Sequence, residues 1–116
     1  MKLPNRERAV VDIRKLRDYC LNPQSPRGRT KARVFASKLA LSQAESAVLL
    51  QELLRAAREQ DCMLAERDEF GTRYTVDFVL ATSKGKTWVR SGWIVKAGED
   101  VPRLTTCYVM LRKRVV

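Results

Sequence analysis

The sequence predicts an α+β fold in which N-terminal helices pack on a curved, three- to four-stranded antiparallel sheet. Apolar residues recur at helical spacing up to about residue 60, and beyond it they alternate with polar residues, as strands require. The chain has 116 residues, 45% of them hydrophobic, which is enough for one core. We therefore expect residues 1–116 to form a single domain, without an internal repeat or a linker.

The first helix is expected to begin at Asp12, which suits an N-cap, and to end near Asn22, because Pro23 follows. The polar residues 1–8 before it are expected to form an arm or a short edge segment. Residues 22–29 hold two prolines and a glycine and predict a basic loop. The apolar face of the helix would carry Ile13, Leu16, Tyr19 and Cys20.

Two more helices are expected before the strands. Thr30 is a candidate N-cap for a short helix that presents Phe35 and Leu39 at i, i+4 spacing. Residues 42–45, "SQAE", fit a capping box, and the helix that follows should run to about Gln60. Its inward face is expected to hold Ala47, Leu50, Leu54 and Ala57.

The sheet is expected in the second half of the chain. Residues 73–80 and 87–97 alternate as strands do, with a hairpin turn at 82–86. A second turn at 97–102 leads into a last strand at 103–111, and residues 62–69 are a candidate first strand. On the second strand, the alternation predicts one face made of Tyr74, Val76, Phe78 and Leu80.

The charge of the chain points to a polyanionic partner. Lys and Arg number 23 against 13 Asp and Glu, for a net charge of +10. Such a field attracts RNA, DNA or an acidic protein, although a small protein can also simply be basic. The start of the chain has no apolar signal segment, and no stretch is apolar over the length that a membrane span needs. We therefore expect a cytoplasmic protein without a membrane partner.

Histidine is absent, and this excludes most common catalytic arrangements. Without it the chain has no Ser–His–Asp or Cys–His nucleophile and lacks the commonest metal ligand. The cysteines Cys20, Cys62 and Cys107 lie far apart, so neither a disulfide framework nor a zinc site is indicated. They suggest buried thiols in a reducing compartment. No metal and no cofactor are expected.

Arginine, lysine, tyrosine and hydroxyl groups can still support RNA cleavage. The 2′-OH of RNA is the nucleophile, so the protein need only orient it, neutralise the phosphate and protonate the leaving oxygen. Arginine suits the phosphate because its planar fork donates two hydrogen bonds at once. Lysine or tyrosine can take part in proton transfer.

Candidate residues for this chemistry fall in three places. In the first, Lys31 lies near an expected helix N-terminus, which attracts anions, although a basic turn in water explains the same residues. In the second, Arg90 is a candidate phosphate ligand, and Trp93 fits the core better than a base-stacking platform. The first place also holds the expected RNA contacts Arg27, Arg29 and Arg33.

The third place is the last strand, "VPRLTTCYVM". Strict alternation sends Arg103, Thr105 and Cys107 to one face and Leu104, Thr106 and Tyr108 to the other. We expect Arg103 to clamp a phosphate, one of the two threonines to bind a non-bridging oxygen, and Tyr108 to stack on a base or donate a proton. Both threonines can equally be plain strand formers.

Four motifs in this order carry a resemblance: "KARVFAS", "FGTRYTVDF", "VRSGWIV" and "GEDVPRLTTCYV". With "KLRDYCLNP" before them, the chain resembles an uncharacterised bacterial domain family found in polymorphic toxins and in stand-alone proteins of the toxin–antitoxin kind. The sheet half resembles the barnase, EndoU and RelE group of metal-independent ribonucleases. The resemblance implies catalytic places for Lys31, Thr105, Thr106 and Tyr108, while Thr30 stands where some relatives have histidine.

Together these observations predict a metal-independent ribonuclease-like toxin that binds RNA and is neutralised by an acidic antitoxin or immunity protein. The alternative is a non-enzymatic basic module that binds an acidic protein or a nucleic acid.

Overall fold

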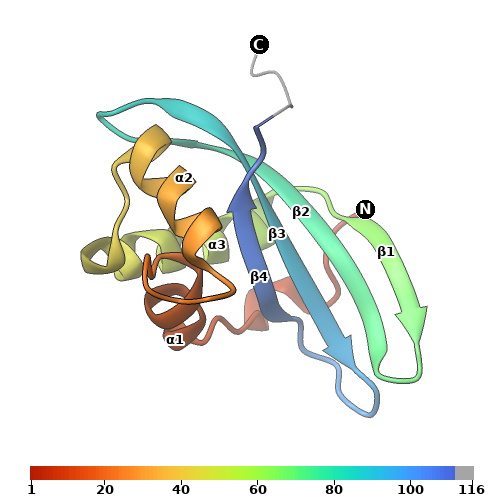
Figure 1. The fold of residues 1–116 in the computed structure, drawn as a ribbon. Coiled ribbons are helices and arrows are strands. Elements are labelled where there is room, and N and C mark those ends of the chain that lie inside the picture. The colour runs from red at the N-terminus through yellow and green to blue at the C-terminus, as the bar shows by residue number, and fades with distance from the viewer. Residues whose placement is uncertain (112–116) are drawn as a thin grey trace.

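The computed structural model describes residues 1–111 of the chain, and these form the expected α+β fold (Figure 1). Helical segments come first and a four-stranded antiparallel sheet follows. The helices are α1, Ile13–Lys15, which continues as a π-helical turn at Leu16–Cys20, then α2, Arg29–Leu39, and α3, Ser46–Glu59. Short 3₁₀ turns occupy Arg6–Arg8 and Gln43–Glu45.

The sheet is a meander with the strand order β1-β2-β3-β4. The strands are β1, Met63–Asp68, β2, Gly71–Ala81, β3, Lys86–Lys96, and β4, Arg103–Val109. Helix α3 packs on β2, α2 packs on β3 and β4, and the π turn packs on β4. Figure 1 shows the helices gathered on the β4 side of the molecule, with β1 at the opposite edge of the sheet.

The core lies between this sheet and the helices. Trp93 on β3 and Phe35 on α2 are its largest fully buried side chains. The predicted inner face of β2 is confirmed, since Tyr74, Val76, Phe78 and Leu80 are all buried. Burial of these large apolar side chains is the main force that joins the two halves.

Local capping signals were reliable at two of the three helix starts. Asp12 caps α1 by accepting a hydrogen bond from the Arg14 N–H. The capping box is present as well, with the Ser42 N–H donating to the Glu45 carboxylate at 2.8 Å. The predicted N-cap Thr30 is wrong, because α2 begins at Arg29 and Gly28 takes the cap position.

Of the predicted inward face of α3, Ala57 is buried as expected, whereas the other three residues are wrong by about one position. Ala47 is exposed and Leu50 and Leu54 are only half-buried, whereas Leu49 and Leu53 are fully buried. Leucines occur here in adjacent pairs, so the sequence pattern fits two neighbouring phases equally well. Packing against β2 selects one of them.

The N-terminal segment is the short edge segment rather than a free arm. Leu3 is buried in the core. Val10 pairs with the beginning of β4, since its N–H donates to the Pro102 carbonyl at 2.9 Å and its carbonyl accepts from the Leu104 N–H at 3.0 Å. This segment therefore covers part of the β4 edge.

A β-bulge in β4 breaks the strict alternation that the sequence predicted. Leu104 is opposite Trp93 and Thr106 is opposite Gly92, which leaves Thr105 as an extra residue without a partner. Beyond the bulge, Cys107 is buried on the same side as Leu104. The expectation that these two residues lie on opposite faces is therefore wrong, because a bulge shifts the alternation by one residue.

Gly28 allows the loop at residues 22–28 to lie against the π turn. A Cβ atom at this position would be 1.9 Å from the Tyr19 carbonyl oxygen. Only a residue without a side chain permits this approach, so the loop brings Arg27 close to Tyr19.

Candidate functional site

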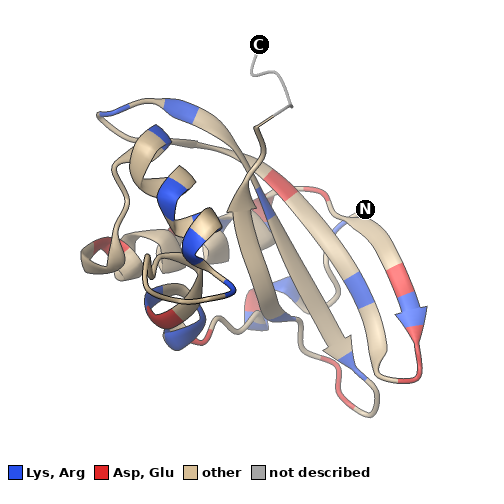
Figure 2. Ribbon diagram, viewed as in Figure 1, with Lys and Arg blue, Asp and Glu red and all other residues tan. Residues whose placement is uncertain are grey.

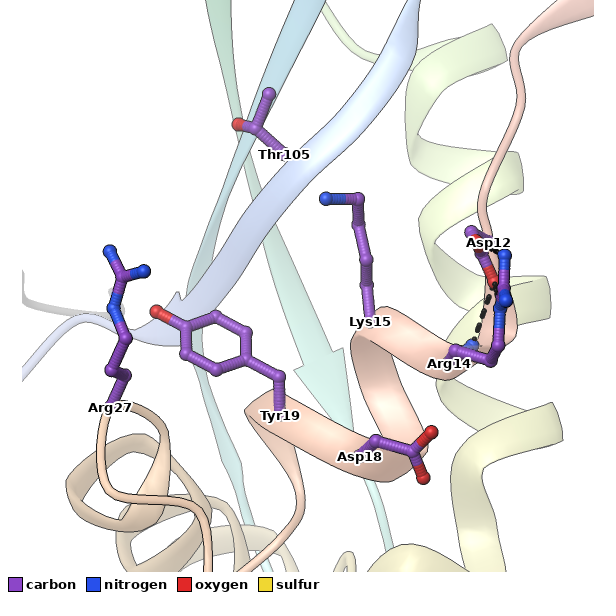
Figure 3. A pocket seen from close by; sticks show the side chains of 7 residues that line it. All are labelled: Asp12, Arg14, Lys15, Asp18, Tyr19, Arg27 and Thr105. Carbon is purple, nitrogen blue, oxygen red and sulfur yellow. Dashed lines mark hydrogen bonds and ion pairs between the residues drawn. The ribbon is translucent and has the colours of Figure 1, made fainter.

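A polar pocket of about 540 Å³ lies between the first helix, the loop before α2 and strand β4 (Figure 3). It is lined by Asp12, Arg14, Lys15, Asp18, Tyr19, Arg27 and Thr105. We refer to it as the polar pocket.

Four side chains surround the same space in the polar pocket. Figure 3 shows the ends of Lys15, Tyr19, Arg27 and Thr105 directed around it, from three different segments of the chain. Within residues 1–111, neither Lys15 nor Arg27 forms an ion pair. Two unpaired cations beside two hydroxyl groups suit an anion such as a phosphate.

The acidic residues of the pocket pair with neighbouring arginines. Asp12 accepts two hydrogen bonds from the Arg14 guanidinium, at 3.0 and 2.7 Å, and these help to lower the pKa of Asp12 to about 2. Asp18 pairs with Arg17, which lowers the pKa of that carboxyl. In Figure 3 the Asp18 carboxylate points away from the centre of the pocket. Both carboxylates are therefore ionised and largely neutralised at neutral pH.

A hydrogen bond joins Tyr19 of the polar pocket to Lys31 of helix α2. The Lys31 ammonium donates to the Tyr19 phenol oxygen at 2.7 Å and lies 4.8 Å from the ring centroid. Because Lys31 is the donor, the hydrogen of the Tyr19 hydroxyl is available to an acceptor in the pocket.

A second, more apolar pocket of about 370 Å³ includes Lys31, the partner of Tyr19 in this hydrogen bond. Lys31 lines it, and Tyr108 reaches it from β4. The remaining lining residues are Thr30, Val34, Val109 and Leu111. We refer to it as the apolar pocket. Strand β4 thus contributes Thr105 to one pocket and Tyr108 to the other.

Arg90 forms an ion pair with Asp77 on the neighbouring strand β2. Its Nε and Nη2 donate to the two carboxylate oxygens of Asp77 at 2.8 and 2.9 Å. These bonds, and a weaker one with the Tyr108 hydroxyl, raise the pKa of Arg90 above its ordinary value. Arg90 therefore lines neither pocket, although it interacts with Tyr108 of the apolar pocket.

Trp93 is part of the core. It is fully buried, and its Nε1 donates to the Ser91 hydroxyl at 2.9 Å, which donates in turn to the Val76 carbonyl at 2.8 Å. A fully buried indole cannot stack on a base without disruption of the core. Trp93 therefore takes the core position that the sequence favoured over a base-stacking platform, and it is not an RNA contact.

Three expected RNA contacts lie outside both pockets. Arg103 pairs with Glu99 at 3.0 Å. Arg29 and Arg33 line a separate pocket of about 240 Å³ beside α2. The site as the structure forms it thus includes Arg27, Lys31, Thr105 and Tyr108 of the sequence-predicted residues.

The two threonines of β4 differ in their surroundings. Thr105 lines the polar pocket. The Thr106 hydroxyl is buried and has no hydrogen-bond partner of standard geometry among residues 1–111, although it lies close enough to the Cys20 thiol to help lower its pKa. Thr105 is therefore the threonine that can meet a ligand.

Sequence reasoning missed Lys15 and Tyr19. Tyr19 was placed on the apolar face of the first helix, and the π turn that ends this helix cannot be recognised from the sequence pattern. The i, i+4 spacing of Lys15 and Tyr19 was a usable signal, since it places both side chains on one helix face. In the described part of the chain, no three Cys, Asp or Glu side chains form a metal-binding group.

Comparisons with known proteins agree with the fold. A family model described as a domain of unknown function, DUF6883, matches residues 2–111. No curated protein matches the chain. Among solved structures, a chain of a contact-dependent growth inhibition toxin–immunity protein complex from Klebsiella pneumoniae 342 is similar, with a TM-score of 0.68 and 16% sequence identity. The match covers 87% of this chain and 99% of that chain. No helix within residues 1–111 has the length and apolar character to cross a membrane.

Proposed function

The chain belongs to the DUF6883 family, and from the geometry of its site we propose that it is a toxin domain that binds RNA and cleaves it through the 2′-OH without a metal ion. An acidic partner protein would hold this activity in check. The observation that carries the proposal is the Lys31–Tyr19 hydrogen bond, which joins a residue of the apolar pocket to a residue of the polar pocket, where two unpaired cations also lie.

The polar pocket has the groups that the phosphate of the scissile bond needs. Lys15 and Arg27 would neutralise the phosphate as it gains charge in the transition state. The Thr105 hydroxyl would donate to a non-bridging oxygen. Such contacts are worth most when they form at a fixed position, and here they come from a helix, a loop and a strand that pack on one another.

Tyr19 is the best-placed proton donor. Its oxygen accepts from Lys31, so its own hydrogen can pass to the leaving 5′-oxygen of a phosphodiester in the polar pocket. Lys31 would hold the phenol in place and stabilise the negative charge left on it. The 2′-OH would lose its proton to solvent water, and Tyr19 would regain a proton from solvent after the 5′-oxygen has left; orientation and charge neutralisation by the pocket supply the acceleration.

The apolar pocket suits a nucleobase. Tyr108, Val34 and Leu111 offer a flat ring and aliphatic surface a short way from the proposed phosphate position. Stacking on an aromatic ring is how proteins commonly hold unpaired bases. The two pockets together would hold a phosphate and an adjoining base.

The charge distribution favours an acidic protein partner. Helix α2 carries four basic and no acidic residues, and the β2–β3 hairpin beside it adds Lys84 and Lys86 (Figure 2). The similar chain of known structure comes from a toxin–immunity protein complex. A partner that covers this basic surface with carboxylates would compete with RNA for it.

Incubation with end-labelled RNA in EDTA tests the proposal. The wild-type protein should cleave the RNA, and Tyr19→Phe and Lys31→Ala should each lower the rate by about tenfold or more, the loss of roughly 1.4 kcal/mol of transition-state stabilisation. Lys96→Ala is a matched control, because Lys96 is exposed at the far end of β3. Salt-dependent RNA binding without any cleavage would favour the non-enzymatic basic module instead.

A further inference from the structure

The pocket of about 240 Å³ beside α2 lies on a different side of this helix from the apolar pocket. Arg29 and Arg33 line it, whereas Lys31 and Val34 line the apolar pocket. At about 100° per residue, these two pairs point to nearly opposite sides of the helix. We refer to the pocket of Arg29 and Arg33 as the arginine pocket. A molecule bound in it would therefore not occupy the candidate site.

The floor of the arginine pocket is aliphatic. Leu21 and Leu41 line it from the segments before and after α2, Ala32 lines it from the helix itself, and all three are buried. Pro23 adds a further apolar wall. Among residues 1–111, no aromatic and no acidic side chain lines this pocket. It therefore offers a hydrophobic surface next to two exposed arginines.

Hydrogen bonds between neighbouring segments fix the walls of the arginine pocket. Ala40 ends α2 in the left-handed region, with a φ of 56°, and the Leu41 N–H donates to the Phe35 carbonyl at 3.2 Å. This helix end turns the chain back along α2. The Gln43 side chain then donates to the Arg17 carbonyl at 2.7 Å, which joins this segment to the π turn. The pocket is thus formed before a partner arrives, and this lowers the entropic cost of binding.

Neither arginine of the pocket has an acidic partner. Within the described part of the chain, no ion pair engages the guanidinium of Arg29 or Arg33. The two residues are four positions apart on α2, a spacing at which like charges repel each other. The first turn of α2 has no acidic residue to offset this repulsion. A carboxylate from another molecule would offset it, and would accept two hydrogen bonds from a guanidinium at once.

We propose that the arginine pocket receives an apolar side chain flanked by carboxylates, presented by the acidic partner protein. This inference rests on the acidic partner of the proposed function and not on the ribonuclease chemistry. The aliphatic floor would bury the apolar side chain, and Arg29 and Arg33 would bind the carboxylates on either side of it. The pocket would thus anchor the partner on the basic surface of α2.

An RNA strand matches the arginine pocket less well than a protein segment does. Among the residues that the structure describes, no aromatic ring lines the pocket for a base to stack on. A phosphate would use the arginines but would gain nothing from the leucines of the floor. A protein segment can supply both a carboxylate and an aliphatic side chain, and so it uses both parts of the pocket.

Two short peptides, acetylated at one end and amidated at the other, test the inference. Their sequences are EDLDE and EDSDE, so they carry the same charge and differ only in the central side chain. We expect the wild-type protein to bind the leucine peptide about five- to tenfold more tightly, because the pocket buries the leucine side chain. Titrations followed by ¹⁵N NMR measure both affinities, and the shifted amides should include residues 29–36 and Leu41.

Substitutions connect this preference to the pocket. The double change Arg29→Gln and Arg33→Gln should weaken binding of both peptides by about tenfold. The control, Arg58→Gln with Lys96→Gln, removes two charges from exposed positions elsewhere and should weaken binding by only about twofold. Ala36→Leu fills the pocket without a change of charge, so it should remove the preference for the leucine peptide and leave binding of the serine peptide unchanged.

The outcomes separate this inference from the proposed function. Equal affinity of the wild type for the two peptides would overturn the inference, and so would a leucine preference that Ala36→Leu leaves intact. Shifts at the arginine pocket caused by single-stranded DNA, used as an uncleavable strand, but by neither peptide would assign the pocket to nucleic acid instead. A leucine preference that Ala36→Leu removes, in a protein that cleaves no RNA in EDTA, would support this inference and contradict the ribonuclease activity alone. If Ala36→Leu fails to fold, the shifted amides of the wild type and the arginine variant still decide.

Discussion

Thr105 and Thr106 are adjacent in sequence but differ in what their hydroxyl groups can do. Thr105 lines the polar pocket, whereas the hydroxyl of Thr106 is buried without a hydrogen-bond partner among residues 1–111. A buried hydroxyl without a partner costs free energy, because it has given up its hydrogen bonds to water. The β-bulge at Thr105 is the reason that two identical residues differ.

Exchange of each threonine for valine should separate a site residue from a structural one. We expect Thr105→Val to lower RNA cleavage by about tenfold or more, from the loss of roughly 1.4 kcal/mol of transition-state stabilisation. Thr106→Val should leave cleavage unchanged and keep or raise the free energy of unfolding, by up to about 1 kcal/mol, because it removes an unpaired buried hydroxyl. Initial rates and urea denaturation measure the two effects. Equal losses of activity in both variants would contradict the assignment.

Arg90 lies near the candidate site, but its guanidinium is paired with Asp77 and is not free to bind a ligand. The side chain of its partner Asp77 is only 10% exposed. We expect Arg90→Ala to lower the free energy of unfolding by about 1 to 3 kcal/mol, because it leaves this carboxylate without the guanidinium. Urea denaturation measures the loss. A variant as stable as the wild type would show that the ion pair contributes nothing and would return Arg90 to the candidate phosphate ligands.

At the scale of the elements, the bulge in β4 and the π turn of the first helix face each other and shape the site. Gly92 on β3 leaves room for the Thr105 side chain, since a Cβ atom there would be 2.9 Å from the Thr105 Oγ1. Gly28 in turn allows the loop to bring Arg27 to Tyr19. Because these two glycines have no side chains, Thr105 and Arg27 can take their places in the polar pocket.

Gly92→Ala should displace the Thr105 hydroxyl. We expect it to lower cleavage by an amount similar to that of Thr105→Ala, because both changes remove the same contact. In a background that already carries Thr105→Ala, the additional change Gly92→Ala should have little further effect on the rate. Additive losses in the double variant would show that Gly92 acts on something other than Thr105.

Features that depend on neighbouring residues in the sequence, such as helix caps, were predicted correctly. Features that depend on packing against a distant segment of the chain were not. Asp12 and the Ser42–Glu45 box identify helix starts because the capping bonds lie within one turn. The phase of α3 and the bulge at Thr105 depend on what packs opposite each element. The role of Tyr19 was missed for the same reason, since its partner Lys31 lies on another helix.

At the scale of the whole molecule, helix α2 and the turn between β2 and β3 carry basic residues and no acidic ones. Helix α2 and the β2–β3 hairpin form one surface, held together by a hydrogen bond from the Thr82 hydroxyl to the Leu39 carbonyl at 2.8 Å. The β1 edge has mixed charge, with Glu66, Asp68 and Glu69 beside Arg67 (Figure 2). A polyanion should therefore approach from the α2 side.

Charge reversal should show which side binds RNA. We expect the double change Lys84→Glu and Lys86→Glu to weaken RNA binding and to reduce the salt dependence of affinity, whose slope is about 0.7 per contacted phosphate for single strands. The double change Arg67→Glu and Lys96→Glu at the other end of the sheet reverses the same number of charges and is the matched control, which should have little effect. Fluorescence anisotropy over a series of salt concentrations measures both. If the control weakens binding as much as the hairpin variant, net charge rather than this surface governs the interaction.

The identity of the RNA ends after cleavage tests the central claim most directly. Attack by the 2′-OH with a proton delivered by Tyr19 requires a 2′,3′-cyclic phosphate on one product and a 5′-hydroxyl on the other. We expect ³¹P NMR of the reaction in EDTA to show the cyclic phosphate with the wild-type protein, and an RNA with a 2′-deoxy residue at the cleavage position to remain intact. Cleavage that needs a divalent metal, that leaves 5′-phosphate ends or that proceeds at the deoxy position would contradict the account.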